Sequence, residues 1–212
     1  MNGVEGEARA GKKEAIKELE ILKKVKDFLE KGKILFEQNF TEDEAKVIFQ
    51  YQLLTMKPRL YLLNGRDEEV GKEVIDEFSK NNWPYLIVDV ITESEAVDLS
   101  KEERMALGLP RDSELDILIK KAYEILGLIT FFTTGPDETR AWTIKNGDTA
   151  PKAGGVIHSD FETNFIRADV INWNGLLDAG GFAQAREKGL IRTEGKGYVV
   201  RDGDVIEIKH NA

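Results

Sequence analysis

Hydrophobic positions recur with a helical period in the first part of the chain. Between residues 12 and 32 apolar side chains stand three or four apart, with Glu and Lys between them. This pattern predicts an amphipathic helix that ends at Gly32. A second helix is predicted over about 42–55, because Thr41 and Glu44 have the spacing of a capping box at its start.

The period changes in the next segment. Residues 59–64 and 85–91 are short, almost continuous apolar runs, the pattern of strands that are buried on both faces. Residues 67–82 carry a helical pattern between them, so the three segments predict a βαβ unit with parallel strands. Further helices are predicted over 101–107 and 112–126.

Two parallel strands with one crossover make an incomplete sheet, because both edges stay open and both faces need cover. One explanation is that the neighbouring helices cap a small α/β domain. The other, which we favour, is that these strands belong to a larger domain whose N-terminal part lies outside this chain. The helix over 12–32 supports it, because no partner helix is evident upstream. The open edge also predicts that the chain can form an oligomer.

Beyond Gly127 the pattern becomes strand-rich. Gly, Asp and Asn separate runs of β-branched and aromatic residues, with short helical stretches between some of them. The expected strands are 130–134, 139–144, 165–173, 198–200 and 205–210, and the expected helices are 149–156, 174–179 and 182–188. Their order predicts a small β-grasp domain, so the expected fold class is α/β followed by α+β.

Composition limits the partners and the location of the protein. The 212 residues are 41% hydrophobic and 33% charged, as in an ordinary globular protein, and the formal charge is −9. This charge argues against coating DNA or RNA, so an RNA contact needs a local patch and no DNA partner is expected. The sequence has no cysteine, no apolar run of ~20 residues and no signal peptide. We therefore expect a cytoplasmic protein without a membrane anchor.

Residues 6–13, GEARAGKK, match the spacing of a phosphate-binding loop but lack its chemistry. Lys13 stands where a Ser or Thr would bind Mg²⁺, and no strand precedes Gly6. We expect a helical turn of small and charged residues here, and no other segment has a phosphate-loop pattern. His158 and His210 are the only histidines, so neither a metal centre nor a Ser-His-Asp triad is predicted.

A four-residue motif follows the first apolar strand. It reads Asn64-Gly65-Arg66-Asp67, and Asn-x-x-Asp after a buried strand is the spacing with which many P-loop GTPases read a purine base. Asp67 would accept hydrogen bonds from guanine N1 and N2, Asn64 would brace neighbouring loops, and the Gly65 backbone would contact the ring. The alternative is an ordinary strand-to-helix turn in which Asp67 caps the next helix.

Aromatic and basic side chains in the last third could contact RNA. The aromatic residues mostly alternate along strands, which is what the core of a small domain needs. The arginines are expected on solvated faces by default. The alternative is a nucleic-acid patch, for which Arg140 and Arg167 are the candidates.

Five segments carry a resemblance to a known family. They are QLLTMKP (52–58), YLLNGRDEE (61–69), ILGLITFFTTGPDETRAWTI (125–144), GDTAPKAGGVIHSDFETNFIRADVI (147–171) and GKGYVVRDGDVIEIKH (195–210). Together they resemble the YchF family, Obg-like P-loop NTPases of the translation-factor class. The likeness runs over nearly the whole chain.

The resemblance implies three parts. Residues 1–57 would be the returning half of a helical (coiled-coil) hairpin, 58–127 the last part of a P-loop G domain, and 128–212 a TGS domain of β-grasp type. The P-loop, the switch regions and the Mg²⁺ ligand of the family would lie upstream. ATP or GTP would be the nucleotide, with Mg²⁺ bound only together with the upstream part.

Two segments differ from the family's base site. The family motif is typically Asn-x-x-Glu, whereas this chain has Asp67 at the acidic position and Gly65 at the middle apolar one. A Ser-Ala-Lys-like loop is expected after the next strand, and Ile91-Thr92-Glu93 stands there instead. The preference between ATP and GTP therefore stays open.

The sequence thus predicts the C-terminal part of a YchF-like, translation-associated NTPase with a degenerate base-recognition loop and no phosphate-binding loop. Whether it acts as an enzyme is left open, and we expect negligible hydrolysis by this chain alone. The alternative is a non-catalytic adaptor whose TGS domain binds structured RNA or the ribosome. A third reading is a TGS-containing fragment with a protein partner.

Overall fold

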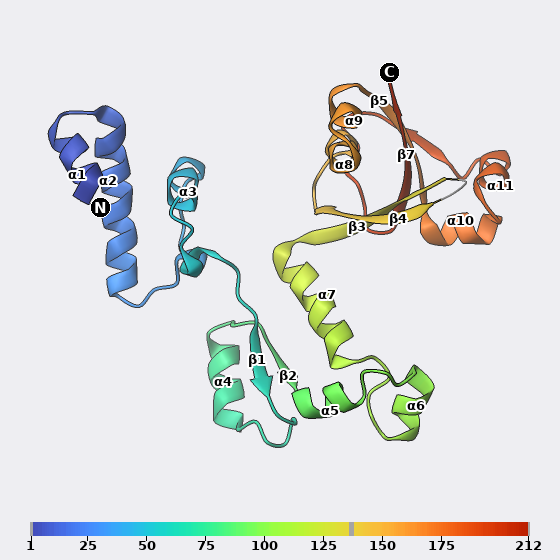
Figure 1. Ribbon diagram of the computed structural model, residues 1–212, viewed down its shortest axis with the longest axis horizontal. Coiled ribbons are helices and arrows are strands. Elements are labelled where there is room, and N and C mark those ends of the chain that lie inside the picture. The colour runs from blue at the N-terminus through green and yellow to red at the C-terminus, as the bar shows by residue number, and fades with distance from the viewer. Residues whose placement is uncertain (1, 136–137, 212) are drawn as a thin grey trace. The chain divides into compact units, whose positions relative to one another are not determined.

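The computed structural model describes residues 2–135 and 138–211 (Figure 1). Met1 and Ala212, the outermost residues of the first and third predicted parts, lie outside the described residues, as do Pro136 and Asp137. The chain divides into two compact units, one of Met1–Leu62 with Val70–Leu86 and the other of Leu63–Glu69 with Ile87–Ala212. The three-part division of the sequence stays a prediction.

The first unit begins with a helical pair. The short helix α1 (Asn2–Arg9) packs beside α2 (Lys13–Glu30), so the expectation that α2 has no partner helix upstream is wrong. The chain reverses between them at Gly11, whose φ of 83° suits glycine. The phosphate-loop-like segment therefore forms a helix and a turn, as expected.

A small core joins α2 to the next helix. Thr41 and Glu44 form the predicted capping box at the start of α3 (Glu42–Phe49), and Lys24 Nζ lies 2.8 Å from Glu44 Oε1. Val25, Leu35 and Ile48 are buried together. The prediction of a helix to residue 55 is wrong, because α3 ends at Phe49 and only a short 3₁₀ turn follows, at Leu54–Met56.

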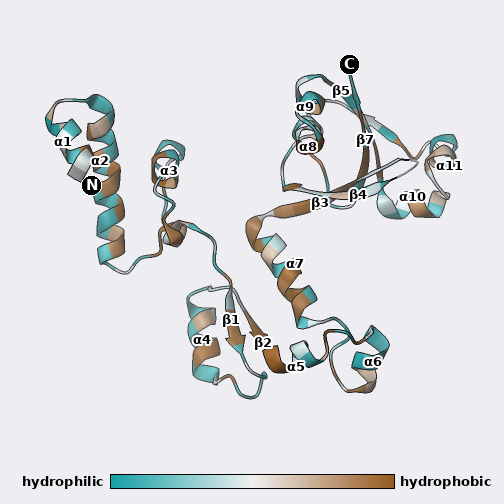
Figure 2. Cartoon of the chain, viewed as in Figure 1, coloured by the Kyte–Doolittle hydropathy of each residue, from teal (hydrophilic) through white to brown (hydrophobic). Residues whose placement is uncertain are grey.

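The predicted βαβ unit is present as β1 (Tyr61–Asn64), α4 (Lys72–Lys80) and β2 (Tyr85–Val88). Tyr61 N–H donates to Pro84 O at 3.0 Å and Gly65 N–H to Val88 O at 3.1 Å, so the strands pair in parallel, as predicted. Figure 2 shows the hydrophobic colouring of this pair. The helix begins at Lys72 rather than at residue 67.

Three helices follow β2. They are α5 (Val90–Glu95), α6 (Lys101–Ala106) and α7 (Glu114–Leu126). The predicted strand to residue 91 is wrong, because the Asp89 carboxylate accepts a hydrogen bond from Thr92 N–H and starts α5. A side chain that caps a helix offers the backbone an alternative to the strand ladder.

The last third forms a five-stranded mixed sheet of order β4-β3-β7-β5-β6. Its strands are β3 (Leu128–Thr134), β4 (Thr139–Lys145), β5 (Phe165–Asn172), β6 (Arg192–Glu194) and β7 (Asp204–His210). β3 and β7 are parallel, and the other neighbours are antiparallel. Residues 198–200 form no strand, which corrects that prediction; Val199 makes a single bridge to Thr149.

Each face of this sheet packs on helices. On one face, Phe131, Val170 and Ile206 pack against α8 (Ala150–Ile157), and α9 (Ser159–Thr163) contacts α8, β5 and β7. On the other face, Ile171 and Val205 pack against α10 (Trp173–Ala179) and α11 (Phe182–Glu187). Because successive side chains along a strand point to opposite faces, the sheet has one hydrophobic core on each face. Among the described residues, no helix is long and apolar enough to cross a membrane.

Candidate functional site

The candidate site is the segment Asn64–Asp67, called the base loop here, which begins at the last residue of β1. The chain leaves the strand through Gly65, whose φ is 144°. L-amino-acid side chains rarely adopt this conformation, and a Cβ here would also lie 3.2 Å from Glu69 Oε2. The middle position of the motif therefore requires glycine for its backbone.

A tight turn closes the base loop. Glu69 Oε2 accepts a hydrogen bond from Arg66 N–H at 3.0 Å, and Glu69 N–H donates to Arg66 O at 2.9 Å. The alternative in which Asp67 caps the following helix is wrong, since Gly71 is the N-cap residue of α4. Asp67 is exposed, and among the described residues its side chain makes no hydrogen bond or ion pair. Its carboxylate is therefore available to a ligand.

Three consecutive residues, beginning with the last residue of β2, contact three residues of the base loop. The pairs are Val88 O with Gly65 N–H at 3.1 Å, Asp89 Oδ2 with Arg66 Nε at 3.1 Å, and Asn64 Oδ1 with Val90 N–H at 3.4 Å. The carboxyl ends of the two parallel strands thus meet at one edge, where α/β sheets place ligands. The Asn64 side chain thus links the end of β1 to the first residue of α5.

Asp89 is the centre of this arrangement. Its Oδ1 accepts from Thr92 N–H at 3.1 Å and its Oδ2 from Thr92 Oγ1 at 2.6 Å. Hydrogen bonds from the Thr92 hydroxyl and amide, with the Arg66 guanidinium after them, lower the pKa of Asp89 from 3.8 to about 2. The carboxylate is therefore charged at neutral pH.

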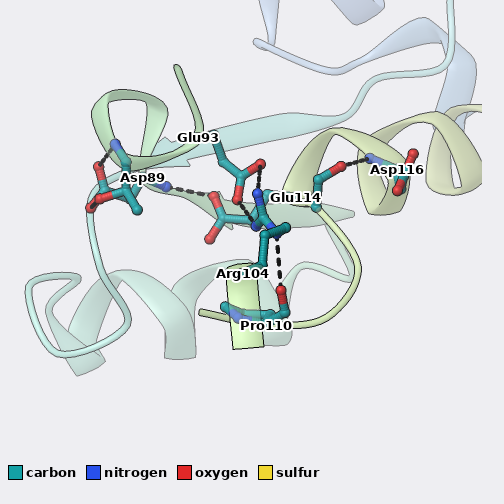
Figure 3. A network of polar contacts seen from close by, with 8 residues as sticks. Asp89, Glu93, Arg104, Pro110, Glu114 and Asp116 are labelled. Carbon is teal, nitrogen blue, oxygen red and sulfur yellow. Dashed lines mark hydrogen bonds and ion pairs between the residues drawn. The ribbon is translucent and has the colours of Figure 1, made fainter. Parts of the chain in front are cut away.

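A second set of polar contacts lies behind Asp89 (Figure 3). Glu114 Oε2, from the first turn of α7, accepts the Asp89 amide hydrogen at 2.7 Å. Arg104, only 3% exposed, forms an ion pair with Glu93 and donates through Nε to Pro110 O at 3.0 Å. These contacts connect α5, α6 and α7 directly behind the base loop.

Glu114 is less acidic than an ordinary glutamate. Burial raises the pKa of its carboxyl above 4.5, although the hydrogen bond from the Asp89 amide acts in the opposite direction. The charges of Glu93, Asp89 and Asp67 add to the rise. The Asp67 carboxylate thus stands in an acidic neighbourhood, which favours N–H donors over anions as its partners.

The structure gives no support for phosphate binding by the segment GEARAGKK. That segment is helix α1 and the turn to α2, and its Lys12 pairs with Glu7 at 3.2 Å. Among residues 2–135 and 138–211, no cluster of three or more His, Asp or Glu could hold a metal ion.

The two arginines proposed for RNA lie on opposite faces of the five-stranded sheet. Arg140, on the edge strand β4, shares a face with Trp142, and its guanidinium lies 4.2 Å from the centre of that ring. Arg167, on β5, lies opposite Lys209 on the face of Asp169. One flat surface cannot contact both side chains.

The sequence reading missed the residues that hold the base loop. Asp89, Arg104 and Glu114 were not singled out. The spacing of Asp89 and Thr92 is a helix-start signal, but it overlaps the end of an apolar run that reads as a strand. The ion pair of Arg104 with Glu93 has no local sequence signal, because the two residues stand eleven apart.

Comparisons with known proteins agree with this architecture. Residues 128–211 match the family model described as "YchF-GTPase_C: Protein of unknown function (DUF933)". Over 216 residues the chain is 43% identical to the "Ribosome-binding ATPase YchF" of Bacillus subtilis (strain 168), covering 96% of this chain and 59% of that protein. Over nearly its whole length the chain is similar to YchF proteins. The resemblance seen in the sequence segments is therefore confirmed.

Other YchF proteins show the same coverage. The "Ribosome-binding ATPase YchF" of Pasteurella multocida (strain Pm70) is 37% identical over 213 residues, which cover 96% of this chain and 58% of that protein. The solved structure of the Schizosaccharomyces pombe YchF GTPase matches with a TM-score of 0.78 at 30% identity, over 93% of this chain and 55% of that one. The chain thus spans less than two thirds of these YchF relatives and shares their mixed α/β fold.

Proposed function

We propose that this chain is the C-terminal part of a YchF-type NTPase and that its base loop recognises the purine of ATP or GTP. In this proposal residues 1–57 are the helical arm, 58–127 the last part of the G domain, and 128–212 a β-grasp TGS domain. The carrying observation is the exposed Asp67 carboxylate, which has no partner among the described residues and stands at the joined ends of β1 and β2.

The chemistry of Asp67 distinguishes the two purines. A carboxylate accepts two hydrogen bonds from the N1–H and N2–H groups of guanine, whereas adenine presents one amino group beside an acceptor nitrogen. The Gly65 backbone approaches either ring without a side chain. Asp67 therefore favours a guanine, and a preference for adenine would require contacts of the backbone alone.

Nucleoside titration followed by NMR tests this proposal. We expect guanosine to shift the Gly65 and Asp67 amide resonances with a Kd of about 1 mM, as for a ligand held by a few hydrogen bonds. Inosine, which lacks the 2-amino group, should bind several-fold more weakly. Asp67→Asn should abolish the difference, whereas Glu68→Gln, which removes the neighbouring exposed charge, should preserve it. No shift with any purine would refute base recognition.

Hydrolysis requires groups outside the proposed base site. We propose that the triphosphate and Mg²⁺ are held by the part of the full-length family that this chain does not span, so turnover of ATP or GTP by this chain should be negligible. A measured, Mg²⁺-dependent turnover that persists in Lys13→Ala and disappears in Asp67→Ala would contradict this division of roles.

A second candidate function is an adaptor that binds the ribosome or structured RNA. The YchF relatives are named ribosome-binding ATPases, and on the edge strand β4 the exposed Arg140 stacks on the half-buried Trp142. We propose that the TGS domain docks through this edge.

Co-sedimentation with ribosomes over a range of salt concentrations tests docking. Arg140→Glu should weaken binding about tenfold and reduce its salt dependence, whereas Arg111→Glu, at an exposed position outside the sheet, serves as the charge-matched control. Arg167→Glu reports whether the opposite face takes part. Binding that none of these changes affects would remove the sheet from the interface.

A further inference from the structure

One carboxylate connects the base loop to a helix start. Asp89 Oδ2 receives both Arg66 Nε, at 3.1 Å, and the Thr92 hydroxyl, at 2.6 Å, while Oδ1 caps α5. The Asp89 amide is held by Glu114 at 2.7 Å. The amide and both carboxylate oxygens of Asp89 thus each have a hydrogen-bond partner outside the base loop.

The base loop has few other restraints. Asn64, Arg66 and Asp67 are exposed, and glycine at position 65 leaves the free chain more conformations than another residue would. The backbone bond from Gly65 holds only the strand end of the loop. The Arg66 backbone is bonded to Glu69 within the turn of the loop itself, and the Arg66 side chain is the contact next to Asp67 that ties the outer half of the loop to the segment after β2.

We infer that Asp89 is a positioning residue for base recognition: by holding Arg66 it fixes the conformation in which Asp67 meets the purine. This inference rests on the proposed function. Arg66 is 66% exposed, and a solvent-exposed ion pair usually contributes little because both partners must be ordered. Here Asp89 is already fixed by Thr92 and Glu114. Forming the ion pair therefore costs the conformational entropy of one side chain only, that of Arg66.

The two roles of Asp89 can be separated by substitution. Asp89→Asn keeps an oxygen that caps α5, since Asn is as good an N-cap residue as Asp, but it removes the charge that holds Arg66. Arg66→Gln removes the other partner and leaves the cap untouched. Asp98→Asn and Arg111→Gln change the same charges at exposed positions away from the loop and serve as controls.

Hydrogen exchange and guanosine titration on the full chain test the inference together. Asp89→Asn and Arg66→Gln should each speed amide exchange at residues 65–69 and weaken guanosine binding about fivefold. The double variant should be no weaker than either single one, because both remove the same contact. Arg66→Lys should restore part of the affinity, and the melting temperature of the two Arg66 variants should stay close to that of the wild type.

Two results would overturn the positioning role. One is unchanged exchange at residues 65–69 in both variants, and the other is additive loss of affinity in the double variant. Failure of the proposed function is distinguishable, because it would appear as absence of guanosine binding by the wild-type chain, while the exchange experiment needs no ligand.

Discussion

Gly65 and Asp67 have different roles in the base loop. Gly65 is required by the backbone, whose φ of 144° suits no other residue well, whereas Asp67 is required by nothing in the described structure. A residue that the fold does not need is the natural candidate for binding. The sequence could predict the pair from its spacing, but the reason for each residue needed the backbone conformation.

Gly65→Ala should destabilise the protein through this backbone conformation. We expect a loss of about 1–3 kcal/mol in the free energy of unfolding, measured by chemical denaturation, because alanine is strained at that φ. Gly197→Ala is the matched control, since nothing lies within 4 Å of a Cβ built there and its φ is not in the strained range. Equal effects of the two substitutions would contradict the explanation.

Asp89 makes the stability of the protein depend on pH in the acidic range. Its pKa is about 2 in the folded chain against 3.8 ordinarily, so its contribution to stability is fully present above pH 3.8 and is lost as the pH falls towards 2. The difference in melting temperature between wild type and Asp89→Asn should be constant from pH 7 to 5 and shrink below about 4. A difference that keeps its size at pH 2 would exclude Asp89 as the cause.

At the scale of elements, the segment after β2 shows what the sequence could not decide. Residues 85–91 are continuously apolar apart from Asp89, and they were predicted as one strand. In the structure Asp89 ends that strand and caps α5, which leaves Val90 51% and Ile91 70% exposed. Here a capping side chain ends the strand and starts the helix, and the hydrophobic pattern alone does not predict such a contact.

The helices behind the base loop depend on a buried ion pair. Arg104→Ala should cost about 3–5 kcal/mol in the free energy of unfolding, because it leaves the Glu93 carboxylate, whose side chain is 14% exposed, without its partner. Replacing both residues with apolar ones, Arg104→Met with Glu93→Leu, should recover most of the loss. Chemical denaturation of the three proteins measures this, and a double variant as unstable as Arg104→Ala would disprove the cost of the unpaired charge.

At the scale of the whole molecule, the two compact units have separate cores. Ile48 is fully buried in the first, and Phe131 is fully buried in the sheet of the second. The general plan, helices followed by a βαβ unit and a strand-rich last third, followed from hydrophobic period. The five-strand order did not, because pairing between strands distant in sequence leaves no local pattern.

The two cores should respond separately to substitution. Phe131→Ala and Ile48→Ala each remove a fully buried side chain, at a cost of about 2–5 kcal/mol. With Trp142 and Trp173 changed to Phe, the remaining Trp83 reports on the first unit, so its fluorescence transition should shift with Ile48→Ala and not with Phe131→Ala. One shared shift would show that the units unfold as a single cooperative body.

Helix α7 has a mechanical consequence. Its first residue, Glu114, holds Asp89. At its other end only Gly127 separates the helix from strand β3. Thirteen helical residues form a rod of about 20 Å, so a tilt of about 10° at the sheet moves the other end by about 3 Å. That displacement is about as long as the hydrogen bond between Glu114 and Asp89, so a tilt of the sheet can break this bond through α7. Helix α7 therefore acts as a lever between the sheet and the proposed recognition of a base.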